Sequence, residues 1–115
     1  MRVTIYHNPR CSKSRKTLAL LQERNLDPEI IHYLDAPPDR QQLQAIIKML
    51  RISARDLVRT GQPEYKELGL NAADVSDNDL IDAMLSHPIL IERPIVVSGE
   101  RARIGRPPES VLEIL

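Results

Sequence analysis

The sequence predicts an α/β fold in which a mixed β-sheet, arranged β-α-β and then β-β-α, carries an inserted helical segment. Two patterns predict it: near the start two β-branched runs flank one helical stretch, and near the end two such runs share a tight turn. Strands joined through a helix run parallel, whereas strands joined by a tight turn run antiparallel. We expect the 115 residues to form a single domain, residues 1–115.

The β-α-β unit is expected at the start of the chain. Val3–Tyr6 is a β-rich run that Asn8-Pro9 closes. Ser12 fits a helix N-cap, and a helix is expected from Lys13 to about Arg24 because its leucines share a broad apolar face. Ile30–Leu34 is predicted as the second strand.

The inserted segment is predicted to be helical. From Asp39 to Leu50, apolar residues recur at the spacing of one helix face, at positions 43, 46, 47 and 50. Ser53-x-x-Asp56 and Ser76-x-x-Asp79 resemble capping boxes. The second precedes an amphipathic helix that ends at His87-Pro88.

The β-β-α part follows. Ile95–Val97 and Ala102–Ile104 are predicted as strands joined by a tight turn at Gly99-Glu100, and Pro107 suits the start of a short closing helix. With helices covering the faces of a mixed sheet, this order predicts a thioredoxin-like fold.

Composition and charge narrow the classes of function. The formal net charge is zero and three tyrosines are the only aromatic residues, which argues against a nucleic-acid or an anionic-membrane surface. No apolar run could span a bilayer, and the first residues do not resemble a secretory signal. One cysteine cannot form an internal disulfide, so we expect a cytoplasmic protein with a reduced thiol.

That cysteine, Cys11, falls between the first predicted strand and the first predicted helix. Backbone N–H groups are unpaired at a helix start and the dipole is positive, so the position favours a thiolate and binds anions. Residues 1–22 hold no acid but five cations: Arg2, Arg10, Lys13, Arg15 and Lys16. His7 could hydrogen-bond to the sulfur or assist proton transfer. A buried structural cysteine is the alternative, but these surroundings favour a reactive thiol.

Three other chemistries lack a residue that they need. Ser14 stands where a C-x-x-C redox pair has its second cysteine, and Thr17 stands where a phosphatase-like loop has its arginine. No metal site is expected, because His32 and His87 have no further ligands at a suitable spacing.

An ordered set of motifs resembles the glutathione/glutaredoxin-coupled arsenate reductase family, with this chain as a short relative. The motifs span nearly the whole chain: residues 7–11 (HNPRC), 33–34 (YL), 57–59 (LVR), 65–70 (YKELGL), 87–91 (HPILI), 93–97 (RPIVV) and 106–107 (RP). Each motif alone is weak, whereas their order is specific. The resemblance implies a thioredoxin-like fold with Cys11 as the catalytic cysteine.

The resemblance also implies the substrate-binding residues. By motif, three arginines would hold arsenate and its cysteine adduct: Arg59, Arg93 and Arg106. Planar guanidinium groups suit a tetrahedral oxyanion. Pro94 and Ser14 would be structural residues at the site, with a cis Arg93–Pro94 peptide beside the cysteine.

The reaction that the resemblance implies needs no bound cofactor. The Cys11 thiolate attacks the arsenic of arsenate or a similar oxyanion, and glutathione, a co-substrate, attacks the adduct. Glutaredoxin then resolves the mixed species and arsenite leaves. His7 and the N–H groups of the first helix would stabilise the thiolate. Neither nucleic acid nor a membrane is an expected partner.

Two other classes stay open. A related thiol oxidoreductase could act on another oxyanion or on a protein mixed disulfide, keeping Cys11 without using all three arginines. A thioredoxin-like regulatory protein would bind a partner and tolerate loss of Cys11, although that branch commonly carries the C-x-x-C that Ser14 breaks. The better-known enzymes continue past the last shared helix, so partner contacts made by such a tail are not expected here.

Overall fold

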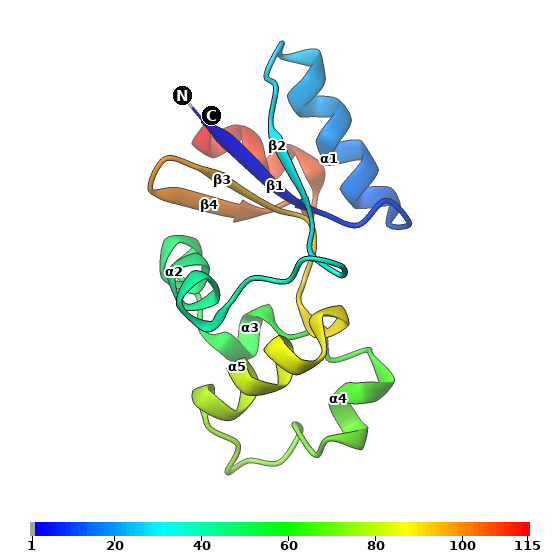
Figure 1. The fold of residues 1–115 in the computed structure, drawn as a ribbon, viewed down its shortest axis with the longest axis vertical. Helices are drawn as coiled ribbons and strands as arrows, with labels where there is room; N and C mark the ends of the chain where they lie inside the picture. Colours follow the sequence, from blue (N-terminus) through cyan, green and yellow to red (C-terminus); the bar gives the residue numbers. More distant parts are fainter. Residues whose placement is uncertain (1) are drawn as a thin grey trace. The chain divides into compact units, whose positions relative to one another are not determined.

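A four-stranded sheet organises the first of two units in the computed structural model, which describes residues 2–115 (Figure 1). This unit contains the chain up to Ala36 together with Arg93–Leu115. Its strands lie in the order β2-β1-β3-β4, with bounds β1 Val3–His7, β2 Glu29–His32, β3 Ile95–Ser98 and β4 Arg101–Ile104. β1 and β2 pair in parallel, whereas β3 pairs antiparallel with both β1 and β4. The predicted α/β fold with a mixed sheet is therefore confirmed.

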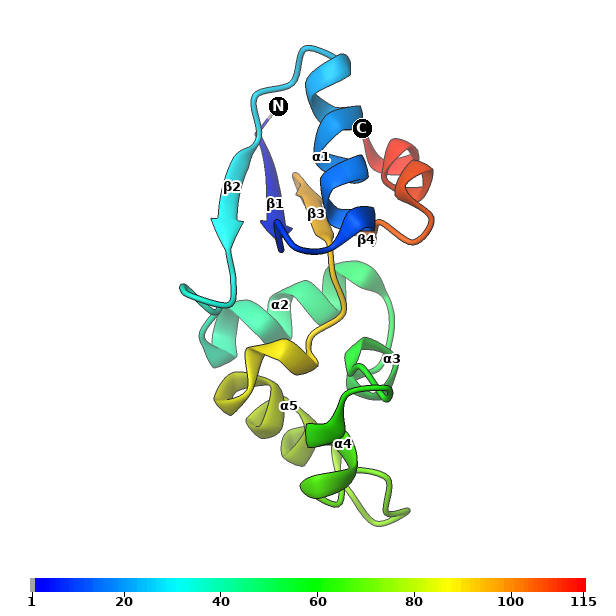
Figure 2. The ribbon, with the colours of Figure 1, turned by 90° about the vertical axis from the view of Figure 1, so that its right-hand side faces the viewer.

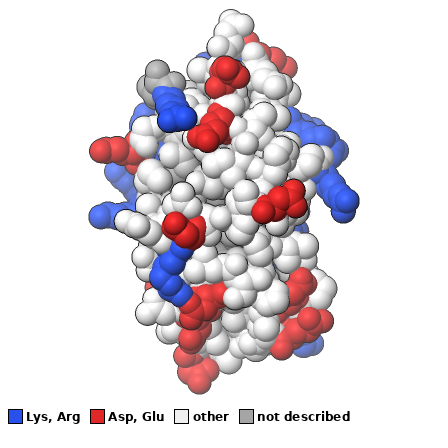
Figure 3. Space-filling model, viewed as in Figure 1, with Lys and Arg blue, Asp and Glu red and all other residues white. Residues whose placement is uncertain are grey.

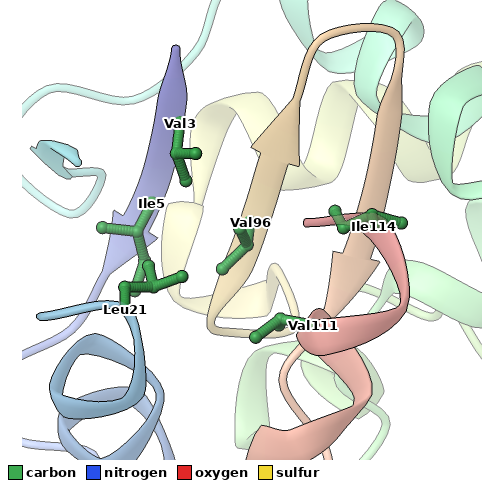
Figure 4. Close-up of a cluster of buried hydrophobic side chains, with 6 residues drawn as sticks. All are labelled: Val3, Ile5, Leu21, Val96, Val111 and Ile114. Carbon is green, nitrogen blue, oxygen red and sulfur yellow. The ribbon is translucent and has the colours of Figure 1, made fainter. Parts of the chain in front are cut away.

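Two helices pack against this sheet. The α-helix α1 (Ser12–Glu23) and the 3-10 helix η2 (Pro108–Ile114) lie side by side on one face (Figure 2). Every second residue of β1 is buried, as expected for a strand with one covered face. The strands and both helices share a core of side chains at most 4% exposed (Figure 4): Val3, Ile5, Leu21, Val96, Val111 and Ile114. Burial of each such side chain stabilises the unit by about 1.5–3 kcal/mol.

Several element boundaries differ from the prediction by one or two residues, and three of the differences have a clear local cause. The N-cap of α1 is Cys11 and not Ser12, because the Cys11 carbonyl already accepts the Arg15 N–H at 3.0 Å. β2 ends at His32, because the N–H groups of residues 35 and 36 both donate to the His32 carbonyl and turn the chain. The closing helix is a 3-10 helix in which Pro107 is the N-cap, so it starts one residue later than predicted.

The turn between β3 and β4 is confirmed. Gly99 has φ of 63°, a left-handed conformation that glycine adopts without a steric penalty. Glycine at this position therefore lets the two strands reverse within two residues.

The second unit, Pro37–Glu92, is helical. Its elements are α2 (Arg40–Leu50), α3 (Ala54–Leu57), α4 (Pro63–Glu67), α5 (Asp77–Ser86) and the 3-10 helix η1 (Pro88–Leu90). Both predicted capping boxes are present, with Ser53 and Ser76 as N-caps, and Asp39 forms a third at α2. α2 packs against α5, and an Arg40–Asp82 ion pair joins the two helices.

The surface of the second unit is acidic around α4 and α5. Residues 63–87 contain six acids (Glu64, Glu67, Asp74, Asp77, Asp79 and Asp82) against Lys66. Figure 3 shows acidic side chains over this part of the surface. Within residues 2–115 no helix is both long enough and apolar enough to cross a membrane.

Candidate active site

Cys11 is held by a short loop between β1 and α1. Its N–H donates to the Asn8 carbonyl at 3.0 Å, and the Arg10 N–H donates to Asn8 Oδ1 at 3.0 Å. The guanidinium of Arg15, from the first turns of α1, donates to the Pro9 carbonyl at 2.8 Å. These bonds fix the loop, and they place the sulfur at the N-terminus of α1. The residue is only 9% exposed.

The surroundings of the sulfur favour the thiolate. Burial raises the pKa of the Cys11 thiol, but four groups oppose it and the net pKa falls below its ordinary value. In order of effect they are the Ser14 N–H, the charge of Arg93, the Lys13 N–H and the charge of Arg106. Hydrogen bonds and cations stabilise the charged form, as expected at a helix start. The two charges come from the distant segment 93–106, and not from the neighbouring cations of the first helix that the sequence suggested.

Arg106 contacts the sulfur directly. Its Nη2 lies 3.9 Å from Cys11 Sγ, and its Nε donates to the Arg93 carbonyl at 2.9 Å. Arg93 Nε is buried and has no hydrogen-bond partner within the described residues. A buried donor without a partner is costly unless something accepts its hydrogen bond, so Arg93 retains a donor for an added acceptor.

The Arg93–Pro94 peptide is cis, as predicted, and so is Arg106–Pro107, which the sequence did not indicate. The Gly105 N–H donates to the Pro94 carbonyl at 2.9 Å, so the ends of the two arginine-bearing segments are hydrogen-bonded together.

His7 reaches this site through Ser14 instead of the predicted sulfur contact. His7 Nδ1 lies 2.7 Å from Ser14 Oγ, and the same hydroxyl accepts the Asn8 N–H at 3.0 Å. Burial, then the nearby His32 and Arg15, lower the pKa of His7, so the ring is neutral near pH 7. Ser14 is fully buried. It therefore links the end of β1 to the helix start through its side chain, while its N–H supports the sulfur.

Gly105 is a residue that the sequence did not single out. A Cβ at this position would lie 2.5 Å from Thr17 Oγ1 and 2.8 Å from Pro94 Cγ. Only glycine therefore lets the end of β4 approach α1 and Pro94 this closely. Its place directly before Arg106 is the one sequence signal that could have indicated it.

Arg59 lies in the second unit. Its Nε is 3.6 Å from Glu92 Oε1, and its Nη1 donates to the Ile89 carbonyl at 3.4 Å. The first unit thus assembles Cys11, Arg93 and Arg106 with His7, Ser14 and Pro94, and the role of Arg59 stays a prediction. Residues 2–115 contain no cluster of three or more His, Cys, Asp or Glu that could hold a metal ion.

Comparison with known proteins identifies the family. The profile of the ArsC family matches residues 6–114. An arsenate reductase of Haemophilus influenzae is 51% identical over 116 residues, covering 100% of both chains. The Escherichia coli protein YfgD, which is described as uncharacterized, is 54% identical over 114 residues, covering 98% of this chain and 96% of YfgD.

A solved structure agrees in fold as well as in sequence. The arsenate reductase from Vibrio cholerae superposes with a TM-score of 0.98 at 50% identity, covering 100% of this chain and 98% of that one. This match confirms the predicted thioredoxin-like α/β fold and, with the family profile, the resemblance drawn from the motifs. The chain belongs to the ArsC family.

Proposed function

We propose that this protein is an arsenate reductase in which the Cys11 thiolate attacks arsenate. The observation that carries the proposal is a thiol with a lowered pKa at a helix start, with the Arg106 guanidinium 3.9 Å from the sulfur. A nucleophile and a cation at that separation suit a dianionic tetrahedral substrate. Relatives named arsenate reductase, such as that of Haemophilus influenzae, support the same substrate.

In the first step the sulfur forms a bond to arsenic and one arsenate oxygen leaves as water. Arg93 and Arg106 would hold the remaining oxygens, with the free Nε of Arg93 as one donor. We further propose that both units act as one domain, in which Arg59 supplies the third guanidinium. The N–H groups of Lys13 and Ser14 support the thiolate before the attack.

External thiols complete the reaction, because Cys11 is the only cysteine. Glutathione displaces a second oxygen, again as water, and its sulfur binds arsenic. A glutaredoxin thiolate then attacks the glutathione sulfur, and the bond between that sulfur and arsenic breaks. The electron pair of the broken bond stays on arsenic and reduces As(V) to As(III). Hydrolysis frees arsenite and restores Cys11. The two electrons come from the two external thiols, which leave as a mixed disulfide. This dependence on reduced thiols fits a cytoplasmic location.

The test measures arsenite formed from arsenate by the purified protein with glutathione and glutaredoxin. We expect turnover with all components and none with Cys11→Ser. If the protein formed no arsenite but reduced a protein–glutathione mixed disulfide, the related thiol oxidoreductase would replace this proposal. If a partner bound equally well with and without Cys11, a regulatory protein would replace it.

A further inference from the structure

We propose that a pocket at the ends of β1 and β2 binds the glutathione co-substrate, with Asp35 holding its amine and Arg10 a carboxylate. This inference rests on the proposed function and names the site of its second substrate. The pocket, called here the β1–β2 pocket, has a volume of about 340 Å³ and lies between residues 7–10 and residues 32, 34 and 35. All of its lining belongs to the first unit.

The wall of this pocket and the nucleophile share one loop. Residues 8–10 line the pocket and Cys11 follows directly, with its N–H bonded to the carbonyl of Asn8. The Arg15 side chain holds the Pro9 carbonyl of the same loop. The wall is thus formed before a ligand arrives, which limits the ordering cost of binding. The wall of the pocket thus ends one residue before the reacting cysteine in the chain.

The two charged residues of the pocket are available to a ligand. Arg10 and Asp35 are both exposed. Neither side chain has an ion pair or a hydrogen bond among the described residues, and only their backbone N–H groups are engaged. One cation and one anion in the same pocket suit a zwitterion. Glutathione carries an ammonium group and two carboxylates, with the thiol between its ends.

The rest of the lining consists of His7, Asn8, Pro9, His32 and Leu34. His7 and His32 meet edge to face with ring centroids 5.8 Å apart, and the lowered pKa of His7 keeps that ring uncharged near pH 7. Leu34 is 41% exposed and lines the pocket, so a ligand backbone would pack on its side chain. These surfaces accept the uncharged peptide part of glutathione.

The larger pocket of the second unit does not fit this ligand. It has a volume of about 410 Å³, and its charged lining residues are Asp79 and Asp82. Asp82 is paired with Arg40, and the lining itself offers no cation to a tripeptide that carries a net negative charge, which Asp79 repels. Of these two pockets, only the β1–β2 pocket is lined by both a cationic and an anionic side chain.

Bound in this pocket, glutathione takes the second step of the reaction. Its sulfur forms a bond to the arsenic of the Cys11 adduct while an arsenic–oxygen bond breaks. The thiol proton and a second proton leave with that oxygen as water, and the oxidation state of arsenic stays at As(V).

The test uses the Cys11→Ser protein and S-methylglutathione, which cannot form a disulfide, with binding measured by titration calorimetry. We expect saturable binding that Asp35→Asn and Arg10→Gln each weaken about three- to tenfold, as for exposed charge-assisted contacts. Asp27→Asn and Arg24→Gln are matched controls, since both residues are exposed in the same unit outside the pocket. They should leave the affinity unchanged.

A second ligand assigns the two contacts. N-acetyl-S-methylglutathione lacks the ammonium charge, so its affinity should not respond to Asp35→Asn and should still fall with Arg10→Gln. Equal affinities for the pocket variants and their controls would overturn the inference, even if arsenite formation were normal. Failure of arsenite formation with intact pocket binding would reject the proposed function instead. In turnover, Asp35→Asn should raise the KM for glutathione and leave the KM for arsenate unchanged.

Discussion

Replacing Gly105 with alanine should test how closely the end of β4 must approach α1. The added methyl group would lie 2.5 Å from Thr17 Oγ1 and 2.8 Å from Pro94 Cγ. Neither neighbour can move easily, because Pro94 is a buried ring and Thr17 is fully buried with its hydroxyl bonded to the Lys13 carbonyl at 2.8 Å. The end of β4 must therefore shift away from α1.

The magnitude follows from two opposing effects. Overpacking of a buried site costs about 1–3 kcal/mol, and two contacts with rigid groups place this site in the upper part of that range. Alanine has less conformational freedom than glycine in the unfolded chain, which by itself raises the free energy of unfolding by about 0.4–1 kcal/mol. The net loss in free energy of unfolding is therefore about 1–2 kcal/mol, and at about 2.1 cal/mol/K per residue the Tm of 115 residues falls by about 4–8 °C.

The shift should also reach the sulfur. Arg106 follows Gly105, and its position depends on a 2.9 Å bond to the Arg93 carbonyl and a 3.9 Å contact with Cys11 Sγ. Moving that guanidinium away removes part of the charge that lowers the thiol pKa. The pH midpoint of Cys11 alkylation should therefore rise in Gly105→Ala.

Thermal unfolding and alkylation rate against pH measure the two effects. Gly61→Ala is the matched control, since a Cβ there meets nothing within 4 Å. Thr17→Ala removes the closer of the two neighbours of the added methyl group. The double variant Gly105→Ala/Thr17→Ala should therefore recover part of the lost Tm and part of the shift in the alkylation midpoint. If Gly105→Ala unfolded and reacted like Gly61→Ala, the packing argument would be wrong.

Four further predictions concern charge and capping. The pH midpoint of Cys11 alkylation should lie below that of free cysteine. Sulfate should raise this midpoint, because a bound dianion disfavours the thiolate. A midpoint at or above that of free cysteine would indicate an unreactive thiol. Folding lowers the pKa of the Cys11 thiol, so the ionised thiol should add to the free energy of unfolding relative to Cys11→Ser. This added stability should be present above the unfolded pKa of the thiol and should disappear as the pH falls through its folded pKa. Denaturation of both proteins at several pH values measures the difference. Changing Arg59, Arg93 or Arg106 to alanine should in each case lower kcat/KM for arsenate by one to two powers of ten, because each change removes a charge-assisted contact worth about 1.5–3 kcal/mol. Lysine at the same position should restore only part of the activity. A variant with wild-type kinetics would show that its arginine does not bind arsenate. Ser76→Ala should destabilise α5 by about 0.5–2 kcal/mol without changing the alkylation midpoint, and an unchanged urea midpoint would contradict its capping role.

Short-range sequence features predicted much of the fold. Both serine capping boxes and the turn at Gly99 depend on residues within four positions of each other, so their chemistry could be recognised along the chain. The helix start at Cys11 was also recognisable, with an error of one residue at its N-cap. Because unpaired N–H groups come with any helix start, a stabilised thiolate followed from local sequence alone.

The charges at the sulfur depend on the tertiary structure. The sequence places Arg10, Lys13 and Arg15 nearest to Cys11, yet the cation that contacts the sulfur is Arg106, 95 residues away. The side chain of Arg15 instead binds the Pro9 carbonyl. The motifs alone indicated that Arg93 and Arg106 belong to the site; neither periodicity nor spacing could, because their approach requires β3 to pair with β1.

The sequence by itself determined the α/β class, the mixed sheet and the family, and it predicted a reactive cysteine, because each follows from local patterns or from the order of motifs. Only the tertiary structure decided that His7 bonds Ser14 and not the sulfur, that Gly105 leaves room for Thr17 and Pro94, and that Arg10 and Asp35 share a pocket. Each of these contacts joins different elements of the fold. Packing of the sheet against α1 and η2 sets their distances, and no pattern along the chain encodes that geometry.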